Sequence, residues 1–286
     1  MPHAKTCAAR RLDLSQPRIM GILNVTPDSF SDGGRFNRLD DALRRAETLV
    51  EQGADMLDIG GESTRPGAQP VTELEEIDRV VPVIEAVAAR SEVPISIDTS
   101  KPGVMRAAVA AGACLINDVN ALRADGALAV AAGAGVPVCL MHMQGEPRSM
   151  QKSPRYADVV AEVRDFLLAR AQACMAAGIA RDDIWIDPGF GFGKTLQHNL
   201  DLLRHLPTLV ETGFPVLIGI SRKSMLGALT GRDVDRRLAG SLAAALLALQ
   251  RGALILRVHD VPETLDVLKI WLAAGRAAAV AQGKEL

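Results

Sequence analysis

The chain has 286 residues, of which 48% are hydrophobic and 23% are charged, and its formal net charge is −2. This balance is typical of a soluble globular protein with a sizeable core. It argues against a nucleic acid or an anionic membrane as partner, because a nearly neutral chain offers neither of them a strong attraction. Aromatic residues make up only 3% of the chain, which further argues against surfaces that stack on bases.

The N-terminus and the cysteines indicate a cytoplasmic protein. The first residues, MPHAKTCAARRLDL, contain no apolar segment of the kind that a signal peptide needs. The longest apolar stretch, 238–249, is too short to span a bilayer. The cysteines are far apart and form no Cys-x-x-Cys pair, so we expect reduced thiols rather than disulfides or a zinc site. They are Cys7, Cys114, Cys139 and Cys174.

Short runs rich in apolar residues predict eight strands. Most of these runs are continuously apolar, as expected for strands of a parallel sheet that are buried on both faces. In chain order they are 19–25, 56–61, 94–99, 115–119, 137–143, 184–189, 215–221 and 254–260.

Helices are predicted between these strands. Four of them end at a glycine, the usual residue just past a helix C-terminus. Thr72 and Glu75 have the spacing of a capping box, and Ser100 is expected to cap the segment that follows it. The helical segments are 39–52, 72–90, 157–177, 233–251 and 261–274.

Strands that alternate with helices predict an α/β fold built from a parallel sheet. Eight such units in a chain of this length favour a closed (β/α)8 TIM barrel, formed by residues 1–286 as a single domain. An open, doubly wound sheet remains the alternative.

Nearly every predicted strand ends in a polar side chain. In a parallel barrel the active site lies at these C-terminal ends. Each residue alone could cap a helix or fix a turn, but buried carboxylates without partners are costly. So many polar groups around one mouth predict a binding site for a polar ligand. In chain order the residues are Asn24, Asp58, Asp98, Asn117, Asp187, Ser221 with Lys223, and Arg257 with His259.

Two features resemble other kinds of site. The segment 188–195 contains Gly-Lys-Thr, but Pro188 stands where a phosphate-binding loop has its first glycine. We therefore predict a close-packed loop whose glycines let a flat ligand approach. His142 lies on the strand face opposite to Met141, and we expect it to be packed rather than catalytic.

Eight stretches at these strand ends resemble the dihydropteroate synthases, a family of pterin-binding TIM barrels. The resemblance covers about residues 19–261 and leaves residues 1–18 as an N-terminal extension. The stretches are GILNVTPDSFSDGG (21–34), DIGGESTRPG (58–67), SIDTSKP (96–102), INDV (116–119), LMHMQG (140–145), DPGFGFGKT (187–195), GISRKSMLG (219–227) and RVHDV (257–261).

The resemblance implies a transferase of folate biosynthesis. Such an enzyme condenses 6-hydroxymethyl-7,8-dihydropterin diphosphate with 4-aminobenzoate and releases 7,8-dihydropteroate and diphosphate. It implies Mg²⁺ as cofactor, sulfonamides as inhibitors and a homodimer. Catalysis would rest on positioning and charge stabilisation rather than on a protein nucleophile.

The resemblance also assigns roles to individual residues. It gives the pterin ring to Asp98, Asn117, Met141, Asp187, Phe192, Gly219 and Lys223. It gives the diphosphate and the aminobenzoate to Asn24, Phe30, Thr64, Arg65, Pro66, Ser221, Arg257 and His259, with Asn24 as the metal ligand. The catalytic residues would be Asp28, Lys223, Arg257 and His259. Segments 25–35 and 61–67 are expected to be mobile loops that close over the diphosphate.

Two other functions fit parts of the pattern. A pterin-binding methyltransferase domain would share the barrel and its acidic and amide strand ends, but would not need the basic residues 221–223 and 257–259. A pterin-binding barrel without activity would not need the polar loop 26–30.

Overall fold

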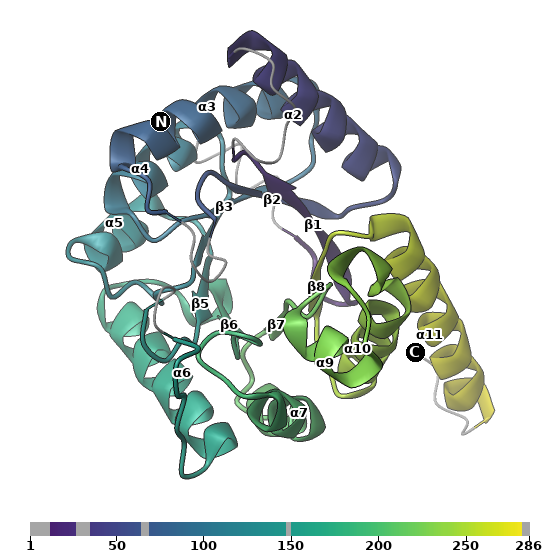
Figure 1. Ribbon diagram of the computed structural model, residues 1–286. Helices are drawn as coiled ribbons and strands as arrows, with labels where there is room; N and C mark the ends of the chain where they lie inside the picture. Colours follow the sequence, from purple (N-terminus) through teal and green to yellow (C-terminus); the bar gives the residue numbers. More distant parts are fainter. Residues whose placement is uncertain (1–11, 27–34, 64–68, 147–149, 282–286) are drawn as a thin grey trace.

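Eight parallel strands surround a central axis, and helices cover their outer side (Figure 1). The structure is a computed structural model that describes residues 12–26, 35–63, 69–146 and 150–281. The strands are β1 (Arg18–Asn24), β2 (Met56–Gly60), β3 (Ile95–Asp98), β4 (Leu115–Asp118), β5 (Val138–Met141), β6 (Ile184–Asp187), β7 (Leu217–Ile218) and β8 (Ile255–Val258).

The sheet closes into a barrel. Its strands follow the order β6-β5-β4-β3-β2-β1-β8-β7, and neighbouring strands in this order pair in parallel. A bridge between Ile186 and Val216, with a hydrogen bond of 2.9 Å from Ile186 N to Pro215 O, joins β6 to the start of β7. The predicted (β/α)8 barrel is therefore confirmed, and the open sheet is wrong.

Helices lie between the strands. They are α2 (Arg35–Glu51), α3 (Glu73–Arg90), α4 (Pro102–Ala111), α5 (Ala127–Ala134), α6 (Val159–Ala176), α7 (Leu196–Arg204), α8 (Pro207–Val210), α9 (Ser224–Thr230), α10 (Leu238–Gln250) and α11 (Val261–Ala281). Of these, α2, α3, α6, α10 and α11 fall at the five predicted segments, although a 3-10 turn precedes α10 within the predicted helix 233–251, and α4, α5, α7, α8 and α9 lie where no helix is predicted. Short 3-10 turns lie at Arg181–Asp183 and Val234–Arg236. Within the described part of the chain, no helix is both long and apolar enough to cross a bilayer.

The predicted helix caps are only partly correct. Thr72 and Glu75 form the full capping box at the start of α3. Ser100, by contrast, does not cap α4, because the capping position falls one residue later, at Lys101, which makes no side-chain cap bond. Thr99 Oγ1 instead accepts the Lys101 N–H at 3.2 Å.

The lower half of the barrel interior is apolar. One side chain from each strand except β3 contributes to a buried cluster, against which Leu12 and Leu14 of the N-terminal segment pack. Burying a large apolar side chain contributes about 1.5–3 kcal/mol to the stability of the fold. This cluster therefore stabilises the barrel below the layer of residues at the C-terminal ends of the strands. Its members are Met20, Met56, Leu115, Cys139, Trp185, Leu217 and Ile255.

The upper half of the interior is mostly polar, for a simple geometric reason. Side chains two residues apart on a strand share a face, so the next inward position lies two residues beyond each member of the apolar cluster. Counting from those members gives Ile22, Asp58, Asn117, Met141, Asp187, Gly219 and Arg257. The strand geometry thus places four of the predicted strand-end residues on one layer: Asp58, Asn117, Asp187 and Arg257.

The described cysteines agree with the prediction of reduced thiols. Cys114, Cys139 and Cys174 are buried, and no disulfide joins any two of them. Burial raises the pKa of Cys139 well above its ordinary value, so this thiol stays protonated and serves as part of the apolar cluster inside the barrel. Cys7 lies outside the described residues.

Candidate active site

Arg257 links two carboxylates at the centre of the barrel mouth. Its Nε donates to Asp58 Oδ2 at 2.6 Å, and its Nη2 donates to Asp98 Oδ2 at 2.7 Å. Asn117 adds a third link, because its Nδ2 donates to Asp58 Oδ2 at 3.2 Å. Residues from β2, β3, β4 and β8 therefore form one hydrogen-bonded network.

In this network one cation faces two carboxylates. Burial acts to lower the pKa of Arg257, but Asp58 and Asp98 outweigh it and raise that pKa above its ordinary value. Burial raises the pKa of Asp98 to about 7, although the charge of Arg257 acts in the opposite direction. The guanidinium thus stays charged, and its Nη1 donates to no acceptor in the described part of the chain, which leaves it available to an anion.

Asp187 and Lys223 form the second charged group of the mouth. Gly189 N donates to Asp187 Oδ1 at 2.7 Å, while Oδ2 has no hydrogen-bond partner among the residues described. Burial raises the pKa of Asp187 and lowers that of Lys223 to about 8, and the attraction between the two charges opposes both shifts. Lys223 also donates to Phe190 O and lies 4.5 Å from the centre of the Phe192 ring.

Flat and flexible apolar side chains border these charges. Met141 is 4% exposed and packs in a cluster with Met143 and Met150, against which Val119 and Phe192 also pack. Thioethers and aromatic faces suit a planar ring. The structure therefore brings Met141 and Phe192 together beside Asp187 and Lys223, as the prediction of a ring site requires.

Ser221 and His259 meet across the ends of β7 and β8. Ser221 Oγ lies 3.0 Å from His259 Nδ1 and accepts the His259 N–H at 3.3 Å. Gly219 lies beside Arg257, since a Cβ added there would be 3.9 Å from Arg257 Cδ. These residues form the β7–β8 side of the mouth.

Asn24 ends β1 opposite Gly60 of β2 and is half-buried. Its side-chain amide makes no hydrogen bond with any residue that the structure describes. The remaining predicted site residues lie outside the described residues: Asp28, Phe30, Thr64, Arg65 and Pro66.

The glycine-rich loop after β6 is closely packed, as predicted, and it does not have the arrangement of a phosphate-binding loop. A phosphate loop offers backbone N–H groups to its ligand. Here Gly191 N donates to Asn199 Oδ1 at 2.7 Å, and Gly189 N is engaged by Asp187. Lys194 is 3% exposed and turned toward protein carbonyls. The prediction of a packed His142 is also confirmed, since that residue is 6% exposed.

The sequence pattern does not reveal the central place of Asp58. The pattern marks it as a strand end without a role, yet its carboxylate joins Arg257 to Asn117. The one feature of the sequence that could have indicated this role is the position of Asp58 at the end of β2. Its partners come from strands far away in the sequence, so the pattern alone could not name them.

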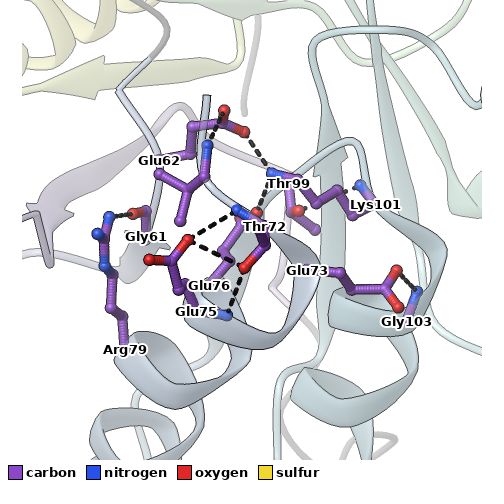
Figure 2. A network of polar contacts seen from close by, with 11 residues as sticks. Gly61, Glu62, Thr72, Glu73, Glu75, Glu76, Arg79, Thr99, Lys101 and Gly103 are labelled. Carbon is purple, nitrogen blue, oxygen red and sulfur yellow. Dashed lines mark hydrogen bonds and ion pairs between the residues drawn. The ribbon is translucent and has the colours of Figure 1, made fainter. Parts of the chain in front are cut away.

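A second network, also not anticipated, joins residues that follow β2 and β3 to the first turn of α3 (Figure 2). Lys101 Nζ contacts Glu62 Oε2 and donates to Glu76 Oε2 at 2.6 Å, while Val71 N donates to Glu62 Oε1 at 3.1 Å. Glu76 is fully buried, and burial raises its pKa although Lys101 opposes the shift. The network fixes residues on both sides of positions 64–68 to the start of α4.

Known proteins resemble this chain over nearly its whole length. A family model described as pterin binding enzyme matches residues 20–259. The dihydropteroate synthase of Haemophilus influenzae is 54% identical over 266 residues, which cover 93% of this chain and 97% of the relative.

Solved structures agree with this match. The structure of Xanthomonas albilineans dihydropteroate synthase with 4-aminobenzoic acid has a TM-score of 0.89 and 57% identity, and the match covers 94% of this chain and 97% of that one. The Xanthomonas albilineans enzyme in complex with 7,8-dihydropteroate gives a TM-score of 0.86 and 54% identity over the same shares of the two chains. A polar barrel mouth with an apolar border, on a chain this similar in sequence and fold, means that the protein belongs to the dihydropteroate synthase family of pterin-binding enzymes.

Proposed function

We propose that this protein condenses 6-hydroxymethyl-7,8-dihydropterin diphosphate with 4-aminobenzoate to form 7,8-dihydropteroate and diphosphate. The observation that carries the proposal is the position of Asp187 and Lys223, whose opposite charges attract, beside the apolar side chains of Met141 and Phe192. The related structures with 4-aminobenzoic acid and with 7,8-dihydropteroate support it.

The pterin ring suits the deeper part of the mouth. A pterin offers a ring N–H next to an exocyclic amine, and Oδ2 of Asp187 is placed to accept from such donors. Lys223 carries the positive charge that a ring carbonyl attracts. Asp98 and Asn117 would serve the remaining ring nitrogens, while Met141 and Phe192 cover the two faces of the ring.

The diphosphate suits the β7–β8 side of the mouth. Arg257, through its Nη1, and His259 with Ser221 offer a cation and polar hydrogens to the departing anion. The C–O bond to the diphosphate breaks and its electron pair leaves with the oxygen. The arylamine nitrogen of 4-aminobenzoate then bonds to the methylene carbon and loses a proton, so no protein nucleophile is required. Positioning and charge stabilisation by these side chains supply the catalysis.

A Mg²⁺ ion on the diphosphate fits the residues present. Within the residues that the structure describes, no group of three or more His, Cys, Asp or Glu side chains could hold a metal ion. Mg²⁺ needs few protein ligands, because it keeps several waters and takes oxygen atoms from substrate phosphates. The Asn24 side-chain oxygen, which accepts from no described residue, would be the protein ligand. When bound, the ion would neutralise charge on the leaving group.

Product identification tests the proposed reaction. The purified protein, incubated with both substrates and Mg²⁺, should form a species with the mass of 7,8-dihydropteroate. A pterin-binding methyltransferase domain or a barrel without activity would bind a pterin but form no such product.

Exposed apolar side chains on neighbouring helices support a homodimer. Leu229 of α9, Leu247 of α10 and Ile270 of α11 are 53%, 38% and 70% exposed. Large exposed apolar groups that gather on one side of a protein are typical of an interface. We propose that this side of the barrel pairs with a second copy of the chain.

The affinity for the pterin is expected to be greatest between about pH 7 and pH 8. Below about pH 7 Asp98 takes up a proton and loses acceptor capacity, and above about pH 8 Lys223 loses its positive charge. Calorimetry with 6-hydroxymethylpterin across this range measures the effect. The Asp98→Asn variant serves as the control, since its affinity should fall less on the acidic side, where Asp187 still titrates, and fall as in the native protein on the alkaline side. An affinity that is independent of pH in the native protein would contradict the assignment.

Aminobenzoate is expected to bind after the pterin and diphosphate. Its proposed pocket depends on Phe30, Pro66 and their neighbours, which follow β1 and β2 and would be organised by the anion. Its affinity should therefore rise at least about tenfold when diphosphate, Mg²⁺ and a pterin are present, a size typical of coupled sites. Titration of 4-aminobenzoate with and without these ligands measures the coupling, and equal affinities would rule out the ordered scheme.

A further inference from the structure

Lys194 is the most enclosed lysine of the mouth and has no role in the proposed chemistry. Its side chain is 3% exposed. Four acceptor atoms surround its Nζ: His142 Nδ1 at 2.9 Å, Gly189 O and Phe192 O at 3.0 Å, and His142 O at 3.2 Å. They come from the end of β5 and from the loop after β6.

The chemistry of these atoms defines the state of the pair. Burial lowers the pKa of Lys194 to about 7, while the charge of Asp187 acts in the opposite direction. Whether charged or neutral, the amine donates N–H groups to the carbonyl oxygens that face it. His142 is a neutral imidazole, because burial and the charge of Lys194 lower its pKa to about 3. Lys194 thus lies between carbonyl oxygens that would otherwise repel one another.

The backbone segments around Lys194 are packed so closely that only glycine fits at two positions of the loop. Gly189 has a φ of +68°, and a Cβ added there would lie 1.9 Å from His142 O. Gly193 has a φ of +61°, and its added Cβ would lie 2.3 Å from Gln144 O. The loop therefore lies directly on residues 142–144, and Lys194 is placed where these two backbone segments converge.

This loop carries two parts of the pterin pocket. Phe192 O is bound by Lys194 directly, which fixes the backbone of the residue whose ring borders the pocket. Gly189 O accepts from the same Lys194 Nζ, and Gly189 N donates to Asp187 Oδ1. From these contacts we infer that Lys194 is a positioning residue that sets the geometry of Asp187 and Phe192 for the pterin ring. The inference rests on the proposed function.

The lysine of this Gly-Lys-Thr motif thus binds different groups from the lysine of a phosphate-binding loop. A phosphate loop directs its lysine and its backbone N–H groups to an anion. Here the lysine donates to carbonyl oxygens of its own loop and of His142, and it would act on the ligand through the backbone that carries Phe192 and contacts Asp187.

The test compares Lys194→Met with Lys269→Met, an exposed lysine on α11 whose side chain is 64% accessible. The first change should raise the dissociation constant of 6-hydroxymethylpterin at least about tenfold, the effect expected when a charged hydrogen-bonding group is lost. The Michaelis constant for the pterin diphosphate should rise by a larger factor than the Michaelis constant for aminobenzoate. Amide hydrogen exchange in 187–195 should also become faster. Lys269→Met should change none of these values.

The outcomes separate this inference from the proposed function. If the native protein does not bind the pterin, the proposed function fails. If the native protein binds it and Lys194→Met binds it equally well, Lys194 has no positioning role. Should the methionine variant not fold, Lys194→Gln decides, because it keeps two N–H donors. A partial loss of pterin affinity would then support the inference, and native affinity would overturn it.

Discussion

Replacing Arg257 with methionine is expected to lower the free energy of unfolding by about 3–5 kcal/mol and to remove most of the activity. The reason is that Asp58, which is fully buried, and Asp98 would lose the cation between them. Removing one partner of a buried ion pair leaves an uncompensated charge, which costs more than the pair itself contributed. The proposed diphosphate site would also lose the contact that the guanidinium supplies. Chemical denaturation and steady-state kinetics measure the two effects.

Arg18→Met is a matched control at the opposite end of the barrel. Arg18 also contacts two aspartates, Asp13 at 3.1 Å and Asp55 at 3.4 Å, and its side chain is 26% exposed against 20% for Arg257. Its partners are more accessible to water, so the loss should be about 1 kcal/mol or less. Equal losses for the two variants would show that Arg257 is not held in a costly buried network.

Asp187→Asn is expected to weaken pterin binding at least about tenfold while the fold stays intact, because a hydrogen bond to a charged group contributes about 1.5–3 kcal/mol. The asparagine keeps an oxygen that can accept from Gly189 N, but it offers the ring an amide in place of a carboxylate oxygen. Calorimetry with 6-hydroxymethylpterin measures the loss.

Asp118→Asn is the control for this change. Asp118 is as deeply buried at the end of β4, but its carboxylate accepts from Asn120 N and Leu122 N, both at 2.7 Å. It follows the inward-facing Asn117 and therefore points away from the mouth. The variant should lose stability and keep its pterin affinity. An Asp187→Asn variant with native affinity would mean that the ring is held elsewhere.

The barrel could be predicted from the sequence alone, because strands buried on both faces leave continuous apolar runs. Even β7, which has only two residues in regular pairing, is evident from its apolar run and its polar end. The alternation of side chains along each strand carries the prediction further, to an inward-facing polar layer at the C-terminal ends.

The pairings within that layer depend on three-dimensional register and could not be predicted. Asp58 and Arg257 are 199 positions apart in the chain, and only the closure of the barrel brings them together. Glu76 shows the same limit, since an acidic residue in the first turn of a helix is usually exposed, yet this one is fully buried against Lys101. Lys194 stands out in the sequence only as part of a misleading motif, because its acceptors are mainly backbone carbonyls, which leave no trace in a residue pattern.

The most direct test of the proposed function is the release of diphosphate from 6-hydroxymethyl-7,8-dihydropterin diphosphate. The reaction is followed with both substrates and Mg²⁺, and again with 4-aminobenzoate or Mg²⁺ left out. Release is expected only in the complete mixture, with one dihydropteroate formed for each diphosphate. Release that is independent of 4-aminobenzoate, or no release from a protein that binds the pterin, would contradict it.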